Sequence, residues 1–140
     1  MVFSQETRLY EIEEAFPDAK GCFISGGDFF EGENGRITLA ELQHKHPTWF
    51  SGDIIYGLER LSEVAGNRKN YVYQVFSDEQ IVSDPNLGNV RMLFLPAKER
   101  KREIYAVLAA GGGYGAVCTL AESLPVAAKL NELGITCFCL

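Results

Sequence analysis

The chain has 140 residues, of which 46% are hydrophobic and 23% are charged, and this length and composition predict one globular domain with a sizeable core. Its formal net charge of −6 provides no positive field for phosphate backbones or anionic lipids, so we expect neither nucleic-acid nor membrane partners. No apolar run reaches the roughly 18 residues of a membrane span and the N-terminus lacks a secretory-signal pattern, so we expect a soluble, cytoplasmic protein.

Residues 1–70 are predicted to form a mainly helical N-terminal leader. Residues 21–27, GCFISGG, have the pattern of a short apolar strand followed by a turn. Thr38 and Glu41 have the spacing of a helix capping box, and the helix that they start ends at Pro47.

A longer helix is predicted later in the leader. Its cap is Ser51 or Asp53, and it ends at Gly66. Its apolar residues recur at helical spacing and predict a buried stripe made by Ile54, Ile55, Leu58, Leu61 and Val64.

Residues 71–140 are predicted to form the sheet. The segments 71–77 (YVYQVFS) and 90–96 (VRMLFLP) are rich in aromatic and β-branched residues, which predicts two antiparallel strands separated by the turn sequence DPNLGN. Residues 104–110 (IYAVLAA) form a continuous apolar run, which predicts a central strand covered on both faces.

A helix and a last strand complete this part of the chain. Pro125 stands at an early helical position, and Gly134 closes the helix. The apolar segment 135–140 follows as another buried strand. Strand, loop, helix and strand form one βαβ crossover, so we predict an α/β fold whose sheet is partly parallel. The four cysteines form no CxxC pair, so we expect reduced thiols and no metal or cofactor.

Three consecutive glycines follow the strand at 104–110 and open the sequence GGGYGA. Glycine lets a ligand approach backbone N–H groups because it has no Cβ. Gly111, Gly113 and Ala116 match the dinucleotide pattern G-x-G-x-x-A, but that pattern needs a helix that opens within it and an acidic residue after the next strand. A phosphate loop would need a Gly-Lys-Ser/Thr ending. A third possible role of the glycine loop is an oxyanion hole. In such a hole each backbone N–H donor stabilises an acyl-transfer intermediate by about 3 kcal/mol.

The segment YAVLAAGGGYGAVCTLAESLPVAAKLNELGITCFCL resembles the start of the sheet in α/β-hydrolase carboxylesterases of the acetyl-xylan-esterase-like and lipase/esterase type. With its upstream strand pair, the resemblance covers residues 71–140. It implies a partial α/β-hydrolase sheet with an antiparallel entry hairpin. It also implies an oxyanion hole made by Gly112, Gly113 and Tyr114, with the tyrosine ring as a pocket wall. Glu122 stands where these esterases commonly carry a glutamate, which would brace the loop or cap the following helix.

The sequence lacks the remaining groups of a serine esterase. It contains no G-x-S-x-G nucleophile elbow, and Ser25, in the nearest similar sequence, precedes the sheet. His44 and His46 also precede the sheet, which is the wrong chain order for the triad, so we expect them at an exposed helix end. Ala110 stands where such enzymes usually carry His or Pro.

The function expected from these patterns is that of the N-terminal portion of a serine carboxylesterase acting on a small carboxylic ester. The serine, acid and histidine are expected beyond Leu140, on a continuation or on a second polypeptide. Because the strand at 135–140 would expose an unpaired edge, we expect a companion chain or a second copy to cover it. Two alternatives stay open: a non-catalytic interaction module derived from a hydrolase, and nucleotide binding at the glycine loop.

Overall fold

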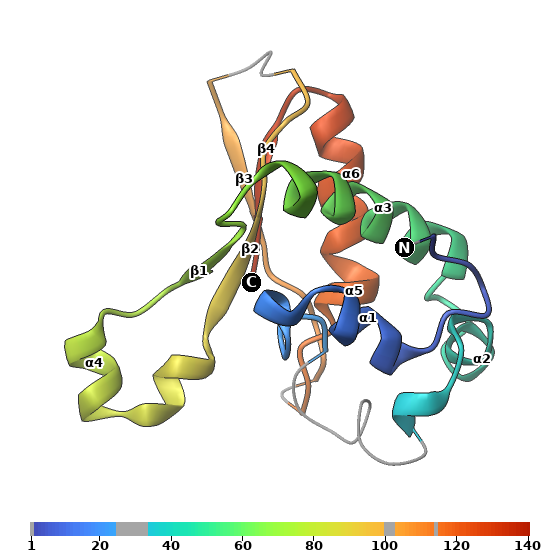
Figure 1. The fold of residues 1–140 in the computed structure, drawn as a ribbon, viewed down its shortest axis with the longest axis horizontal. Coiled ribbons are helices and arrows are strands. Elements are labelled where there is room, and N and C mark those ends of the chain that lie inside the picture. Colours follow the sequence, from blue (N-terminus) through green and yellow to red (C-terminus); the bar gives the residue numbers. More distant parts are fainter. Residues whose placement is uncertain (1, 25–33, 100–102, 114) are drawn as a thin grey trace.

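The computed structural model describes residues 2–24, 34–99, 103–113 and 115–140 and contains a four-stranded mixed sheet (Figure 1). The strands are β1 (Val72–Gln74), β2 (Arg91–Leu95), β3 (Tyr105–Leu108) and β4 (Thr136–Cys139), and they lie in the order β1-β2-β4-β3. β2 runs antiparallel to both β1 and β4, whereas β3 and β4 are parallel. The predicted α/β class, with an antiparallel strand pair and one parallel crossover, is confirmed.

β4 lies inside the sheet, and β3 lies at its edge. Phe138 of β4 is opposite Phe94 of β2 on one side and Val107 of β3 on the other. The expectation that segment 135–140 has an unpaired edge is therefore wrong. The predicted coverage of both faces of β3 is also wrong, because Tyr105 and Val107 are 69% and 55% exposed. A continuous apolar run does not distinguish a central strand from an edge strand.

Within the described residues, six α-helices and three short 3-10 segments accompany the sheet. The α-helices are α1 (Leu9–Ala15), α2 (Leu39–Lys45), α3 (Ser51–Asn67), α4 (Asp78–Ser83), α5 (Thr119–Glu122) and α6 (Leu124–Glu132), and the 3-10 segments are Pro17–Ala19, Asn34–Arg36 and Pro85–Asn89.

The predicted start of α2 and both predicted ends of α6 are confirmed. α2 starts with the capping box, in which the Glu41 amide donates to Thr38 Oγ1 at 3.2 Å and the Thr38 amide donates to Glu41 Oε2 at 2.7 Å. α6 has Pro125 in its first turn, and Gly134 follows the helix with φ of 79°, the left-handed conformation that ends many helices.

α3 begins at Ser51, although this serine does not cap it. The N-cap is Phe50, which makes no side-chain hydrogen bond. Both the amide and the hydroxyl of Ser51 donate to Oε1 of Gln43 at 2.8 Å. These bonds join α3 to α2 and take the serine oxygen away from the helix start. The helix ends at Asn67, one residue beyond the predicted Gly66.

The structure differs from the sequence prediction at one predicted strand and at two helices that were not predicted. Residues 21–24 form a turn and bend instead of the predicted strand, and residues 25–27 of that prediction lie outside the described residues. α1 was not predicted, because two buried residues, Leu9 and Ile12, are too few to give a periodic pattern. α4 occupies the connection expected to be a turn, and the preceding Ser77 caps it.

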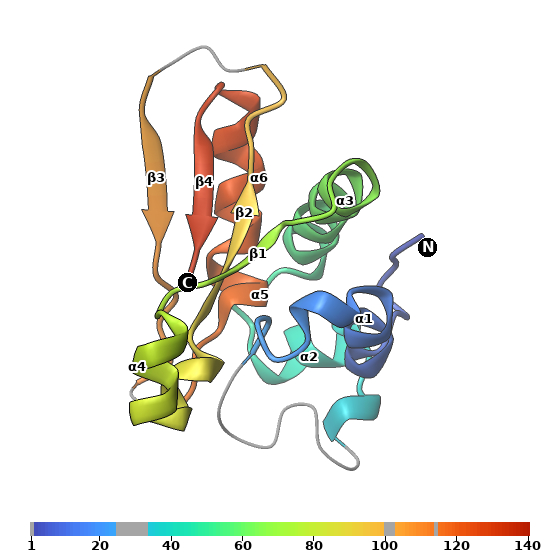
Figure 2. The ribbon, with the colours of Figure 1, turned by 60° about the vertical axis from the view of Figure 1, so that its left-hand side comes forward.

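α3 and α6 lie on one side of the sheet (Figure 2). The side chains beneath them, Leu93, Leu95, Cys137 and Cys139, are at most 1% exposed. Residues of the segments 1–70 and 71–140 contribute to a single hydrophobic core. Burial of these side chains stabilises the sheet, with α6 in contact with β4 and β2 and with α3 packed against α6.

The opposite face of the sheet carries a row of four aromatic rings. Ring centroids are 5.8 Å apart for Tyr73 and Phe94, 5.1 Å for Phe94 and Phe138, and 5.8 Å for Phe138 and Tyr105. The guanidinium carbon of Arg68 lies 4.9 Å from the centroid of Phe94. No described helix lies over this aromatic row (Figure 2).

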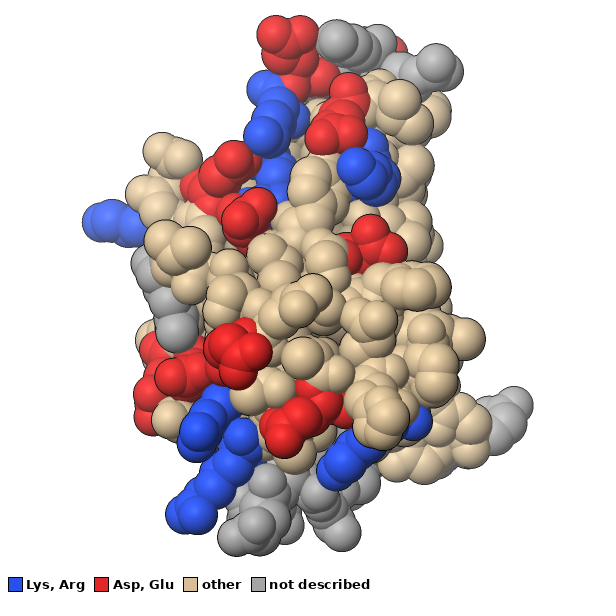
Figure 3. Space-filling view, turned by 90° about the vertical axis from the view of Figure 1, so that its right-hand side faces the viewer, with Lys and Arg blue, Asp and Glu red and all other residues tan. Residues whose placement is uncertain are grey.

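Charges of both signs are mixed over the helical side of the molecule (Figure 3). Lys98, at the start of the basic sequence KERKR, pairs with Glu63 at 3.1 Å, whereas residues 100–102 lie outside the described residues. None of the helices that the structure describes is long and apolar enough to cross a membrane.

Candidate functional site

The glycine loop, residues 111–116, leads from β3 toward α5 through a tight turn. Gly112 and Gly113 have φ of 151° and 60°, which residues with side chains rarely adopt. The amides of Gly115 and Ala116 both donate to the carbonyl of Gly112 at 3.1 Å. A Cβ on Gly112 would lie 1.8 Å from the carbonyl oxygen of Ala116, so this turn requires glycine.

Two carbonyl oxygens of the loop accept hydrogen bonds from residues that follow them, and two amides of the loop are left open. Besides the bonds to Gly112, the Cys118 amide donates to the carbonyl of Gly111 at 3.1 Å. The amides of Gly112 and Gly113 have no acceptor among the described residues, and both glycines are exposed. These N–H groups are therefore available to a ligand oxygen. Tyr114, the third predicted donor, lies outside the described residues.

Glu122 holds the start of the glycine loop. Its Oε2 accepts a hydrogen bond from the Gly111 amide at 2.6 Å. Because Glu122 is the last residue of α5, the helix positions the carboxylate against the loop. A Cβ on Gly111 would come within 3.0 Å of the same oxygen, which favours glycine there as well. The predicted bracing of the loop by this glutamate is confirmed.

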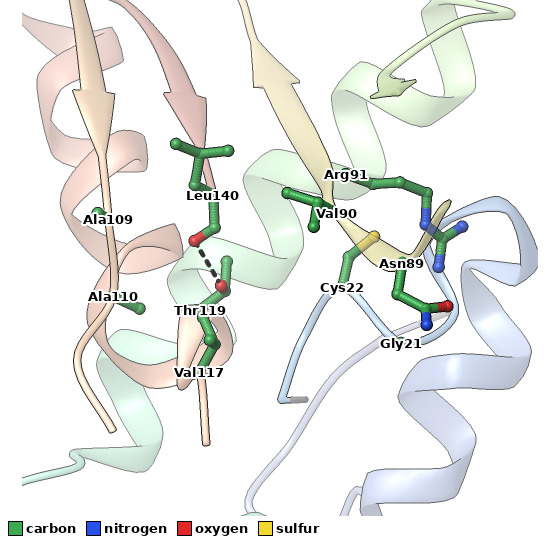
Figure 4. A pocket seen from close by; sticks show the side chains of 10 residues that line it. All are labelled: Gly21, Cys22, Asn89, Val90, Arg91, Ala109, Ala110, Val117, Thr119 and Leu140. Atoms are coloured by element: carbon green, nitrogen blue, oxygen red, sulfur yellow. Dashed lines mark hydrogen bonds between the residues drawn. The ribbon is translucent and has the colours of Figure 1, made fainter. Parts of the chain in front are cut away.

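A pocket of about 310 Å³ lies beside the loop (Figure 4). Ala110, before the glycines, and Val117, after them, both line it. The hydroxyl of Thr119 donates to the carbonyl of Leu140 at 3.0 Å, so this polar group is already satisfied within the wall. The described residues that line it are Gly21, Cys22, Asn89, Val90, Arg91, Ala109, Ala110, Val117, Thr119 and Leu140.

The other sequence candidates do not join this site. His44 lies in the last turn of α2 and is exposed, as predicted, while the half-buried ring of His46 stacks on Trp49 with centroids 4.4 Å apart. Neither histidine lines the pocket. Ser25 lies outside the described residues. α5 begins only at Thr119, after the G-x-G-x-x-A pattern has ended, so the helix required for dinucleotide binding does not open within it.

The far wall of the pocket was not found from the sequence. Arg91, the first residue of β2, donates through Nη1 to the carbonyl of Asp18 at 3.2 Å and through Nη2 to the carbonyl of Lys20. These bonds fasten Gly21 and Cys22 beside the sheet. Because their partners are more than 70 residues apart, no local pattern could have indicated them. Burial raises the pKa of the Cys22 thiol, which favours the protonated form of this wall residue.

The fold and the site together define an α/β protein with an open glycine loop and a small pocket at the end of its parallel strands. In the part of the chain that the structure describes, no three His, Cys, Asp or Glu side chains gather to hold a metal ion. No protein-family model, curated protein or solved structure matches this chain.

Proposed function

We propose that the chain is the N-terminal portion of a serine carboxylesterase of the α/β-hydrolase type, and that the glycine loop forms its oxyanion hole. The order of elements supports this: an antiparallel strand pair is followed by a strand, the glycine loop, a helix and a parallel strand. The observation that carries the proposal is the pair of open amides at Gly112 and Gly113, beside a pocket. The substrate is a small carboxylic ester, such as an acetylated sugar.

The loop contributes to the step in which negative charge develops. A serine oxygen bonds to the acyl carbon, and the electron pair of the carbonyl π bond moves onto the carbonyl oxygen. In the proposed reaction the amides of Gly112 and Gly113 donate to this oxygen, and each donor stabilises the charge by about 3 kcal/mol. Glu122 holds Gly111 in place, which keeps the two donors together. In this proposal Tyr114, which lies outside the described residues, is the third donor.

The rest of the reaction needs groups outside this chain. The intermediate collapses, the bond to the alcohol oxygen breaks, and the triad histidine gives that oxygen its proton. Water then attacks the acyl-serine and releases the acid. The serine, the acid and the histidine lie on a continuation of the chain or on a second polypeptide. The chain works in the cytoplasm, where its four free cysteines stay reduced.

A serine-directed probe tests the proposal. Material containing this chain is isolated from its source cells and treated with a fluorophosphonate, and the labelled peptide is sequenced by mass spectrometry. We expect a labelled serine within G-x-S-x-G, together with turnover of p-nitrophenyl acetate. In that material Gly112→Ala should lower kcat about 100-fold. Gly66→Ala is the matched control, because its Cβ would have no neighbour within 4 Å. If the material shows neither a labelled serine nor turnover, the proposal is wrong.

The uncovered sheet face favours a second candidate, a non-catalytic interaction module. Parallel strands are normally covered by helices on both faces, yet the aromatic row is uncovered and no described strand pairs with the outer edge of β3. A companion chain or a second copy would pair with β3 and cover the row. A module binds such a partner without any labelled serine. Nucleotide binding, the third hypothesis, predicts thermal stabilisation by NAD or ATP, and no shift at millimolar ligand would exclude it.

A further inference from the structure

We propose that the pocket beside the glycine loop binds an uncharged acyl chain that is longer than acetyl, with about four to six carbon atoms. This inference rests on the proposed function, because it names the acyl group of the same site. Two observations carry it: the pocket is larger than an acetyl group needs, and its described walls offer a ligand apolar contact and no charge within reach.

The volume of the pocket sets the length of the chain. A closed apolar cavity of about 150 Å³ holds benzene, which has six carbon atoms. The pocket here has about 310 Å³ and is half open to solvent, so only part of that volume encloses a ligand. An acetyl group, with two carbons and one oxygen, would leave most of the pocket empty. A chain of about four to six carbons fits it better.

The wall nearest the glycine loop offers apolar contact. Ala109, Ala110 and Val117 contribute methyl groups that line the pocket, and Val117 is 38% exposed. The Thr119 hydroxyl is bonded to the Leu140 carbonyl at 3.0 Å and needs no ligand. A methylene chain along this wall would therefore cover apolar surface without taking a partner from any polar group.

The opposite end of the pocket holds no charge that a ligand can reach. Arg91 has the only charged side chain among the described residues that line the pocket. Its guanidinium lies beyond Cys22, its Nε is buried, and both Nη atoms donate to the backbone carbonyls of Asp18 and Lys20 (Figure 4). The exposed Asn89 can stay hydrated. A charged end on the ligand would lose water here without gaining a partner.

The pocket and the loop are continuous along the chain. Ala110 directly precedes the glycines and Val117 follows the loop, so an ester whose carbonyl oxygen lies at Gly112 and Gly113 can extend its acyl chain between these two walls. Complete burial of one methylene group strengthens binding about fourfold. Because the pocket is half open, we expect about twofold for each methylene.

Binding to the chain itself tests the inference without any turnover. The ¹⁵N-labelled protein is titrated with methyl acetate, methyl butanoate and methyl hexanoate. We expect shifts of the Ala110, Val117 and Thr119 amides and about 16-fold tighter binding of the hexanoate than of the acetate. Equal affinities along the series would overturn the inference. So would shifts confined to the aromatic row, at Phe94 and Phe138, because the esters would then bind the sheet face.

A charged ester of similar size tests the polarity of the pocket. Monomethyl glutarate replaces the last two carbons of the hexanoate chain by a carboxylate. It should bind about tenfold more weakly than methyl hexanoate, because no described side chain in the pocket can pair with its charge. Tighter binding of the glutarate would show that the pocket selects an anion, and the inference would be wrong.

Variants locate the binding. Val117→Phe should fill the pocket and weaken methyl hexanoate binding at least tenfold, and the 38% exposure of Val117 lets the larger ring avoid the core. Ala110→Val narrows the same pocket by a smaller change and should weaken binding less. Val126→Phe is the matched control, since Val126 is 47% exposed on α6 and does not line the pocket. Unchanged binding by both pocket variants would contradict the assignment.

The same titrations separate this inference from the proposed function. If the esters shift the pocket residues but never Gly112 or Gly113, the acyl pocket is supported and the oxyanion hole is not. If methylphosphonate shifts the two glycine amides while no ester binds at millimolar concentration, the oxyanion hole is supported and this inference is wrong.

Discussion

Gly112→Ala is the substitution that tests the shape of the glycine loop most sharply. The added Cβ would lie 1.8 Å from the oxygen and 2.4 Å from the carbon of the Ala116 carbonyl, whereas real Cβ contacts are essentially never shorter than 3.0 Å. The backbone must therefore move by about 1.2 Å, the difference between 1.8 Å and 3.0 Å. Two hydrogen bonds from Gly115 and Ala116 to the Gly112 carbonyl would then be lost. At about 1 kcal/mol for each bond, with 1–2 kcal/mol of backbone strain, we expect a local cost of about 3–4 kcal/mol.

Because the loop is exposed and can rearrange, only part of this local cost lowers the free energy of unfolding, about 1–3 kcal/mol. Gly113→Ala should cost about 1 kcal/mol, because the Cβ would meet no atom within 4 Å and only the φ of 60° opposes it. Gly66→Ala, at the end of α3, should stabilise by up to about 1 kcal/mol. Urea unfolding followed by circular dichroism measures these differences. Equal stability of Gly112→Ala and Gly113→Ala, with protected Ala116 amides in both, would refute the described turn.

Three further predictions concern the rest of the fold. Asn131→Ala should lower the free energy of unfolding by about 2–4 kcal/mol in urea, because this buried amide donates to the carbonyls of Leu95 at 3.0 Å and Ile135 at 2.9 Å; a loss below 1 kcal/mol would show that water replaces these bonds. Burial raises the pKa of Cys137 to about 11 and that of Cys139 to about 12, so at pH 8 both thiols stay protonated. Iodoacetamide should modify them far more slowly in the native protein than in guanidinium, and equal rates would contradict their burial. Val107→Lys should make the purified chain monomeric in light scattering if it self-associates through β3; unchanged association would place the contact elsewhere.

Local patterns predicted much of the fold. The capping box at Thr38 and Glu41, the proline in the first turn of α6 and the antiparallel strand pair all depend on residues close in sequence. The order of strands across the sheet depends instead on whether β4 pairs between β2 and β3 or on the outer edge of β3. No residue type in IYAVLAA encodes that choice. β3 was therefore predicted as a central strand, although its exposed Tyr105 and Val107 lie at the edge.

The candidate site also has a part that local sequence patterns predicted and a part that they did not. The glycine loop was found from the sequence, because three glycines after a strand are unusual and each has a steric or conformational reason in the structure. The role of Glu122 followed from a resemblance and is confirmed by its bond to Gly111. The far wall, with Cys22 and Arg91, is assembled by contacts across more than 70 residues, and sequence patterns do not report such contacts.

The most direct test of the account is a titration of the ¹⁵N-labelled chain with methylphosphonate, a small oxyanion. The account predicts that the Gly112 and Gly113 amides exchange rapidly with solvent in the free protein and shift together on titration. The Gly111 amide should stay protected by its bond to Glu122 throughout. Protected amides at Gly112 and Gly113 that ignore the anion would show that the glycines form only a bend, and the oxyanion hole would have to be abandoned.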